Sequence, residues 1–142
     1  MSVFVDANVI IYAANPSPSY DQARLFMGAF MDGGLEGVTS TAVLEEVWHA
    51  ESRDRLTGLR GATRDAYELL EPLLPVTDAV FRRALDLDAA RLGTNDRVHV
   101  ATCLEHGIDT IVTADADFDD VPGLRRVDPL APGALERLRA TS

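Results

Sequence analysis

The chain has 142 residues, 46% of them hydrophobic, and a formal net charge of −10 at pH 7. This length predicts a single domain over residues 1–142 with a sizeable core. The acidic excess argues against a broad phosphate-binding surface, and no apolar run approaches the ~18 residues of a membrane span, so we expect a cytoplasmic protein without membrane contact.

The basic residues and the single cysteine exclude several kinds of site. All 13 basic residues are arginine, so mechanisms that need a lysine ammonium are excluded, including the Walker-type phosphate loop. Cys103 alone forms neither an internal disulfide nor a cysteine zinc cluster. Any chemistry must therefore come from other side chains.

The chain begins with an apolar run that one acid interrupts. Residues 3–5 are β-branched or aromatic, as in a strand buried on both faces, and residues 10–14 continue as an apolar helix. Asp6 therefore lies where a strand ends, which is the edge at which α/β sheets bind ligands. An aspartate that caps the following helix has the same sequence signature, so both interpretations stay open.

Helices and short strands alternate along the rest of the chain. Periodicity and caps predict helices over residues 21–31, 42–52, 66–74, 77–92, 95–106 and 132–139. Short strands are predicted over residues 35–39, 110–113 and 123–127, with one more extended piece at Val76. This alternation favours an α/β fold with a parallel sheet covered by helices.

A glutamate in the helix 42–52 is the second candidate acid, and two neighbours compete for the role. The apolar face of this helix consists of Val43, Leu44, Val47, Trp48 and Ala50. Glu46 borders that face, whereas Glu45 points nearly opposite, so Glu46 can face inward. A surface glutamate near a helix start is the ordinary alternative.

Two further acids occupy comparable positions. Asp96 lies in the first turn of a nearly all-apolar helix, where capping is the alternative role. Asp115 follows the strand 110–113 and begins an acid-rich stretch, of which Asp119 and Asp120 are expected to be solvated. Asp115 and Asp117 alternate and so share a side.

If Asp6, Glu46, Asp96 and Asp115 converge, the site requires a cation. At an effective dielectric of ~20, two carboxylates ~5 Å apart repel by about 3 kcal/mol. Oxygen ligands without a cysteine or a histidine pair favour Mg²⁺, with Mn²⁺ as the second choice. One or two such ions polarise a phosphate, activate a water for in-line attack and stabilise the leaving 3′ oxygen, which predicts phosphodiester cleavage.

Four motifs in this order resemble those of the PIN domain, and at this length the chain resembles VapC-type toxins of bacterial toxin–antitoxin pairs. They are Val-Asp-Ala-Asn-Val at 5–9, Ser-Thr-Ala-Val-Leu-Glu-Glu at 40–46, Asn-Asp-Arg-Val-His-Val-Ala-Thr at 95–102 and Thr-Ala-Asp-Ala-Asp-Phe at 113–118. The resemblance covers essentially the whole chain.

The resemblance implies a three-layer fold with a five-stranded parallel sheet and Mg²⁺-dependent endoribonuclease activity. It also implies a homodimer and an antitoxin whose C-terminal segment covers the acidic pocket. The catalytic quartet then falls on Asp6, Glu46, Asp96 and Asp115, with Asp6, Asp96 and Asp115 as metal ligands, Asn8 and Thr113 orienting them, and Asp117 as a fifth acid.

Two other enzyme classes agree less well with the sequence. Phosphoaspartyl enzymes rely on a lysine, which this chain lacks. A paired-histidine ribonuclease needs two of His49, His99 and His106 to converge, and the spacing brings at best one of them near the acids. A catalytically idle PIN-like binding module and a PIN nuclease outside a toxin–antitoxin pair both stay open.

An arginine-rich segment follows the helix 42–52. We expect it to contact RNA or a partner, because the remaining surface is too acidic to hold a polyanion. A solvated connection between helices is the alternative. The arginines concerned are Arg53, Arg55, Arg60 and Arg64.

Overall fold

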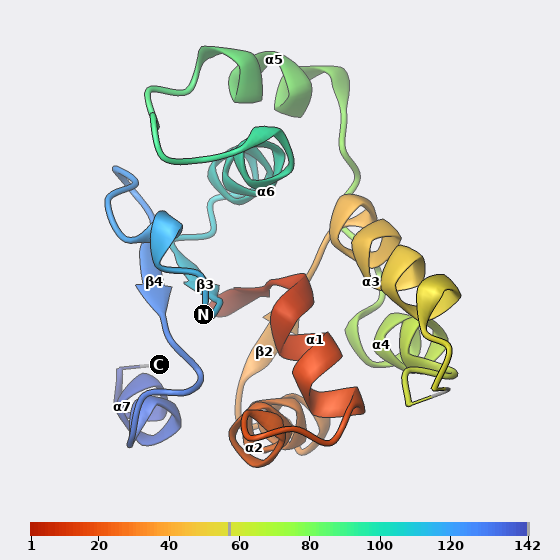
Figure 1. The fold of residues 1–142 in the computed structure, drawn as a ribbon. Helices are drawn as coiled ribbons and strands as arrows, with labels where there is room; N and C mark the ends of the chain where they lie inside the picture. The colour runs from red at the N-terminus through yellow and green to blue at the C-terminus, as the bar shows by residue number, and fades with distance from the viewer. Residues whose placement is uncertain (57, 142) are drawn as a thin grey trace.

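The strands form at the short β-branched and apolar runs of the sequence. The computed structural model describes residues 1–56 and 58–141, and its strands are β1 (Ser2–Val5), β2 (Glu36–Val38), β3 (Thr110–Val112) and β4 (Arg125–Val127). All neighbouring strands are parallel, in the order β2-β1-β3-β4, so β1 and β3 occupy the centre (Figure 1). The predicted parallel sheet is confirmed.

The described residues form four strands rather than the five that the resemblance implied. Where a fifth strand was expected, the sheet is continued only by an isolated parallel bridge between Ser40 and Leu74. The amide of Leu74 donates to Thr39 O at 2.9 Å and the amide of Thr41 donates to Leu74 O at 3.1 Å, but a helix begins at Thr41, so this segment leaves the sheet there. This edge therefore ends after one pair.

Helices connect the strands and cover both faces of the sheet. They are α1 (Ala7–Ala14), α2 (Tyr20–Met31), α3 (Thr41–Arg53), α4 (Ala62–Leu70), α5 (Asp78–Asp86), α6 (Thr94–Glu105), the 3₁₀ turn η1 (Ala116–Phe118) and α7 (Ala134–Ala140). Figure 1 shows α1 and α2 on one side of the sheet and α5 and α6 on the other. Within the described residues, no helix is both long and apolar enough to cross a membrane.

One predicted helix is shorter than expected. The pattern predicted a helix over residues 77–92, but α5 ends at Asp86. The guanidinium of Arg97 donates to the carbonyl oxygens of Leu87 at 2.6 Å, Ala89 at 2.9 Å and Leu92 at 3.3 Å. These bonds hold residues 87–92 as a loop because they satisfy the carbonyls from outside a helix.

A second predicted helix is displaced along the chain. The helix expected over 66–74 runs instead from Ala62 to Leu70. Its start is stabilised by Glu51, whose carboxylate accepts from the amides of Gly61 and Thr63, both at 3.0 Å. A carboxylate on α3 thus caps α4, which no local pattern near residue 62 indicates.

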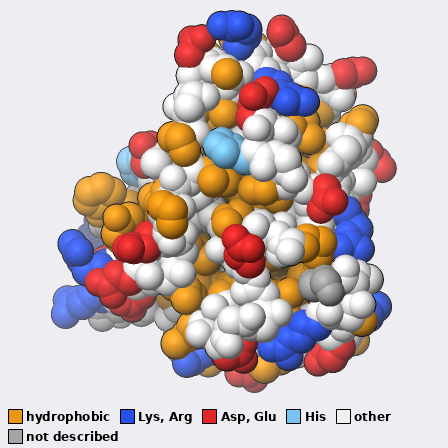
Figure 2. Space-filling view, turned by 180° about the vertical axis from the view of Figure 1, so that it is seen from behind, with side chains coloured by type: hydrophobic (Ala, Val, Ile, Leu, Met, Phe, Trp, Pro, Cys, Tyr) orange, Lys and Arg blue, Asp and Glu red, His pale blue; other side chains and the backbone are white. Residues whose placement is uncertain are grey.

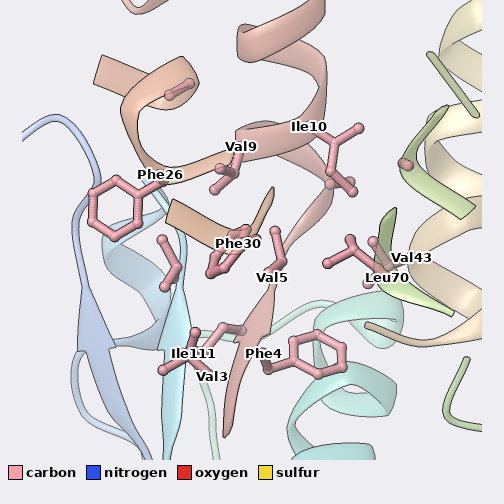
Figure 3. Packing of buried hydrophobic residues seen from close by; sticks show 14 of the residues in the cluster. Val3, Phe4, Val5, Val9, Ile10, Phe26, Phe30, Val43, Leu70 and Ile111 are labelled. Atoms are coloured by element: carbon pink, nitrogen blue, oxygen red, sulfur yellow. The ribbon is translucent and has the colours of Figure 1, made fainter. Parts of the chain in front are cut away.

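The core surrounds the central strand. Figure 3 shows the β1 side chains Val3, Phe4 and Val5 packed among apolar residues from the helices and from β3. A smaller apolar cluster, Val80, Ala84 and Ala101, joins α5 to α6. Because β1 is buried along most of its length, the residue that follows it is held rigidly.

Candidate acidic metal site

Asp6 follows β1 directly and is only 5% exposed. Its Oδ1 accepts from the amide of Ala7 at 2.8 Å, so the capping role left open by the sequence is present. Its Oδ2 accepts from the hydroxyl of Thr113 at 2.8 Å and from the amide group of Asn8 at 3.3 Å. Three donors therefore fix this carboxylate at the end of the central strand.

The two predicted orienting residues contact both Asp6 and each other. Asn8 donates to the hydroxyl oxygen of Thr113 at 2.8 Å and accepts from the amide of Ala114 at 3.2 Å. The same Thr113 oxygen accepts from the amide of Asp115 at 3.1 Å. This network ties the end of β1 to the loop that follows β3.

Glu46 reaches Asp6 from α3, through a histidine on α6. Nε2 of His99 lies 2.7 Å from Glu46 Oε1 and 4.0 Å from Asp6 Oδ1. One ligand atom from each of the three residues lies within 4.8 Å of the other two. The helical wheel correctly predicted that Glu46 faces inward and Glu45 outward. It wrongly placed Trp48 on the buried face, because this side chain is 63% exposed.

His99 is the residue of this site to which the sequence analysis gave no role. It is completely buried, and its ring packs at 6.1 Å from the Phe4 ring. A usable signal was present: a histidine one turn after Asp96, inside a helix that is apolar around its circumference. His49 and His106 are exposed, so within the described residues no histidine pair enters the acidic cluster.

The electrostatics of Asp96 show that the four predicted acids influence one another. Burial, then the charge of Asp6, raise the pKa of Asp96 to about 6, with smaller contributions from Asp115 and Glu46 and an opposing one from His99. Burial also raises the pKa of Asp6, although His99 and hydrogen bonds oppose this rise. For His99, burial alone lowers the pKa, but the bond to Glu46 and nearby carboxylates outweigh it and raise the pKa.

Asp115 and Asp117 differ in their surroundings. Asp115 is half-buried, and its Oδ1 caps η1 by accepting from the amide of Asp117 at 2.9 Å. The side chain of Asp117 pairs with Arg91 at 3.3 Å. The predicted fifth acid thus has an arginine partner, and it does not belong to the group formed by Asp6, Glu46 and His99.

The arginine-rich segment begins at Arg53, the last residue of α3, and continues into α4. Its four arginines are all exposed. Arg53 is seven residues past Glu46, a rise of about 10 Å along a helix. Thr57, within the segment, lies outside the described residues. Arg64 lines a groove of about 460 Å³ between α3 and α4, together with Trp48 and Tyr67.

The surface agrees with a local rather than a broad nucleic-acid contact. On the face shown in Figure 2, basic side chains form separate small groups among acidic ones, and hydrophobic side chains occupy much of the centre. No continuous basic patch covers this face.

The residues of the site fit a divalent cation. Asp6, which is buried, and Glu46 each supply a carboxylate oxygen, and Nε2 of His99 lies within 4.8 Å of both. In residues 1–56 and 58–141, no arginine forms an ion pair with Asp6, Glu46 or Asp96. Apart from the contact of His99 with Glu46 and Asp6, the negative charge of these acids is thus left for a cation.

Comparisons with known proteins give one consistent result. The sequence model of the PIN domain matches residues 3–124. The chain is 28% identical to the ribonuclease VapC13 of Mycobacterium tuberculosis over 132 residues, which cover 88% of this chain and 98% of that protein.

Solved structures share the fold. DNA-bound VapBC from Salmonella typhimurium superposes with a TM-score of 0.70 at 18% identity, covering 91% of this chain and 98% of that one. VapC20 of Mycobacterium tuberculosis, described as a toxin that cleaves the sarcin-ricin loop, gives 0.65 at 22% identity, with coverage of 87% and 98%.

Proposed function

We propose that this chain, which belongs to the PIN-domain family, is a metal-dependent endoribonuclease and the toxin of a toxin–antitoxin pair. The observation that carries the proposal is the buried Asp6 carboxylate, grouped with Glu46 and His99, near enough to Asp96 to raise its pKa and without an arginine counter-ion among the described residues. Relatives named ribonucleases, such as VapC13, support the activity.

In this proposal Asp6, Asp96 and Asp115 hold the cation, and Glu46 completes the catalytic quartet. PIN nucleases are metal-dependent, and the oxygen-rich donor set favours Mg²⁺, with Mn²⁺ as a substitute. The bound ion supplies Lewis acidity toward a phosphodiester.

The protein's own contribution is to hold these acids in place. Thr113 and Asn8 fix the orientation of Asp6 before any ion binds, so little reorganisation is needed. With a pKa of about 6, Asp96 is mostly ionised at pH 7 and is available as a ligand.

RNA is the proposed substrate, and the exposed arginines Arg53, Arg55, Arg60 and Arg64 are proposed to steer it. Since each phosphate contact contributes about 0.7 to 0.9 to the slope of log affinity against log salt, replacing two of them should flatten that slope. If both RNA affinity and its salt slope stay unchanged, the segment has no such role.

Solved VapBC complexes that share this fold support an antitoxin as partner. We propose that it covers the acidic pocket and that the toxin itself is a homodimer, as the resemblance implies. Co-expression with the candidate antitoxin should suppress RNA cleavage and yield a stable complex.

The decisive experiment compares matched carboxylate variants in an RNA cleavage assay with Mg²⁺. Asp6→Asn and Asp96→Asn should each reduce cleavage at least about 100-fold with an unchanged circular dichroism spectrum, since each removes a proposed ligand charge. Glu46→Gln should be impaired, whereas its exposed neighbour, Glu45→Gln, should retain wild-type activity.

If both aspartate variants still cleave RNA, the proposed mechanism is wrong. A wild-type protein that binds RNA without cleaving it would instead favour the idle binding module. Sequencing RNA 5′ ends after expression identifies the cleaved target.

A further inference from the structure

Asp6 and Glu46 are held in very different ways. Asp6 is short and accepts three hydrogen bonds from neighbouring groups. Glu46 has a longer, more flexible side chain that is one-third exposed. Among residues 1–56 and 58–141, its carboxylate has one hydrogen-bond donor, His99. If Glu46 is to meet Asp6 in a defined geometry, that single contact must position it.

His99 is suited to this role because it is rigid. Its side chain is completely buried in α6, with the ring packed against Phe4 of the central strand. A donor locked by packing loses little conformational entropy on forming a hydrogen bond, whereas a free glutamate side chain loses much of its rotamer freedom when it is ordered. The His99 side chain thus loses most of its conformational entropy when the core folds, before it contacts Glu46.

The direction of the hydrogen bond follows from chemistry. An ionised carboxylate only accepts, so Nε2 of His99 must carry the hydrogen, whether or not the ring is charged. Nδ1 is buried and has no partner among the described residues. With the Nε2–H tautomer, a neutral ring leaves Nδ1 as an unpaired acceptor, and in both charge states the Nε2 hydrogen points to Glu46.

The same distance argues against His99 and this Glu46 oxygen both binding one ion in the observed arrangement. Adjacent ligand atoms on an octahedral ion with bonds of about 2.1 Å lie about 3 Å apart. The observed separation of 2.7 Å is that of a hydrogen bond to a charged group. Nε2 is therefore engaged by Glu46, and the second Glu46 oxygen remains for other contacts.

We propose that His99 is the positioning residue of Glu46. It donates its Nε2 hydrogen to the α3 carboxylate and thereby links α3 to α6 across the acidic site. This inference rests on the proposed function and adds Glu46 to the residues that contact the cation, besides Asp6, Asp96 and Asp115. Its test is therefore metal binding rather than RNA cleavage.

The experiment is a double-mutant cycle on Mn²⁺ affinity, measured by calorimetry at fixed pH. His99→Phe keeps a ring against Phe4 and removes the donor, and it should weaken Mn²⁺ binding about 10-fold or more, as loss of an outer-shell partner typically does. In a Glu46→Gln background the same change should have little further effect, because the carboxylate it positions is gone. His99→Gln, which restores a donor, should recover part of the affinity.

Two controls separate this role from a general structural one. His106→Leu, at the exposed end of α6, should leave Mn²⁺ affinity unchanged. If His99→Phe does not fold, nitrogen NMR of the wild type and Glu46→Ala replaces it: the His99 Nε2–H resonance should exchange slowly with solvent in the wild type and faster in the variant, which lacks the acceptor.

Effects of His99→Phe and Glu46→Gln that simply add would overturn the inference, as would unchanged affinity in His99→Phe or an Nε2–H signal insensitive to Glu46→Ala. Wild-type protein that fails to bind Mn²⁺ at all would overturn the proposed function as well. Normal wild-type binding with no coupling would overturn only the role of His99.

Discussion

Two groups of aspartates lie near the ends of β1 and β3, and they have opposite electrostatic environments. The inner group, Asp6 and Asp96, is buried or half-buried, and burial raises the pKa of both residues. The outer group, Asp117, Asp119 and Asp120, pairs with arginines, and a hydrogen bond from Arg126 lowers the pKa of Asp119.

This difference shows how one residue type serves two purposes on one edge of a sheet. Arg91 pairs with both Asp117 and Asp120, and Arg126 forms a two-pronged contact with Asp119 at 2.5 and 3.3 Å. Acids that already have an arginine partner gain little from an ion, whereas the inner acids repel one another until a cation binds. The presence or absence of arginine thus separates structural acids from candidate ligands.

The largest effect should come from removing one acid of each group in turn. Asp6→Asn is expected to lower Mn²⁺ affinity by more than about 100-fold, beyond the usual effect of outer-shell partners. Asp119→Asn should leave that affinity within about 3-fold of the wild type, because Arg126 already neutralises this acid. Calorimetric titration measures both, and an equal loss in the two variants would abolish the distinction between the groups.

The second effect concerns stability. Arg126 is only 14% exposed, and besides Asp119 it donates to the Thr113 carbonyl at 3.2 Å. Arg126→Ala should lower the free energy of unfolding by about 2 kcal/mol, since a partly buried carbonyl loses its donor and packing is lost. Arg82→Ala, which breaks an exposed pair with Asp78, is the matched control and should cost under about 0.5 kcal/mol. Urea unfolding compares the two, and equal losses contradict the argument.

The smallest effect is a gain in the free energy of unfolding rather than a loss, and it depends on pH. The pKa of Asp96 is about 6 in the folded protein against an ordinary value of 3.8, so ionising Asp96 destabilises the metal-free fold. The neutral form of Asp96 is the one that the fold favours. Its stabilising contribution is therefore complete below about pH 4 and is lost as the pH rises through 6. Asp96→Asn should therefore raise metal-free stability at pH 7 by about 1 to 2 kcal/mol, allowing for solvent screening, and have little effect near pH 4.

Thermal unfolding at both pH values, with EDTA present, measures this gain. Adding Mn²⁺ should reverse the order, because the wild type then gains more from the ion. A variant that is less stable than the wild type at pH 7 without metal would contradict the assigned environment of Asp96.

Much of the fold was predictable because it depends on local patterns. Buried β-branched runs mark β1 and β3, and the strand-end positions of Asp6 and Asp115 follow from them. The inward turn of Glu46 follows from helical periodicity. These features need no information about distant parts of the chain.

The features that sequence reasoning missed depend on distant partners. The end of α5 is determined by Arg97 on the next helix, and the start of α4 by Glu51 on α3. His99 acquires its contact only when α3 packs beside α6. Trp48 was misplaced because the buried stripe of α3 is narrower than its apolar residues suggest.

The long sequence separations within the acidic site also have a consequence for biosynthesis. The hydroxyl of Thr113 and the carboxylate of Asp6 are 107 residues apart, and β1 pairs with β3 as a central strand. At a translation rate of about 5 to 20 residues per second, roughly 5 to 20 seconds separate the synthesis of these two residues. During that interval the first strand lacks one of its neighbours and Asp6 lacks its strongest side-chain donor. The acidic site is therefore among the last parts of the molecule to form as the chain leaves the ribosome.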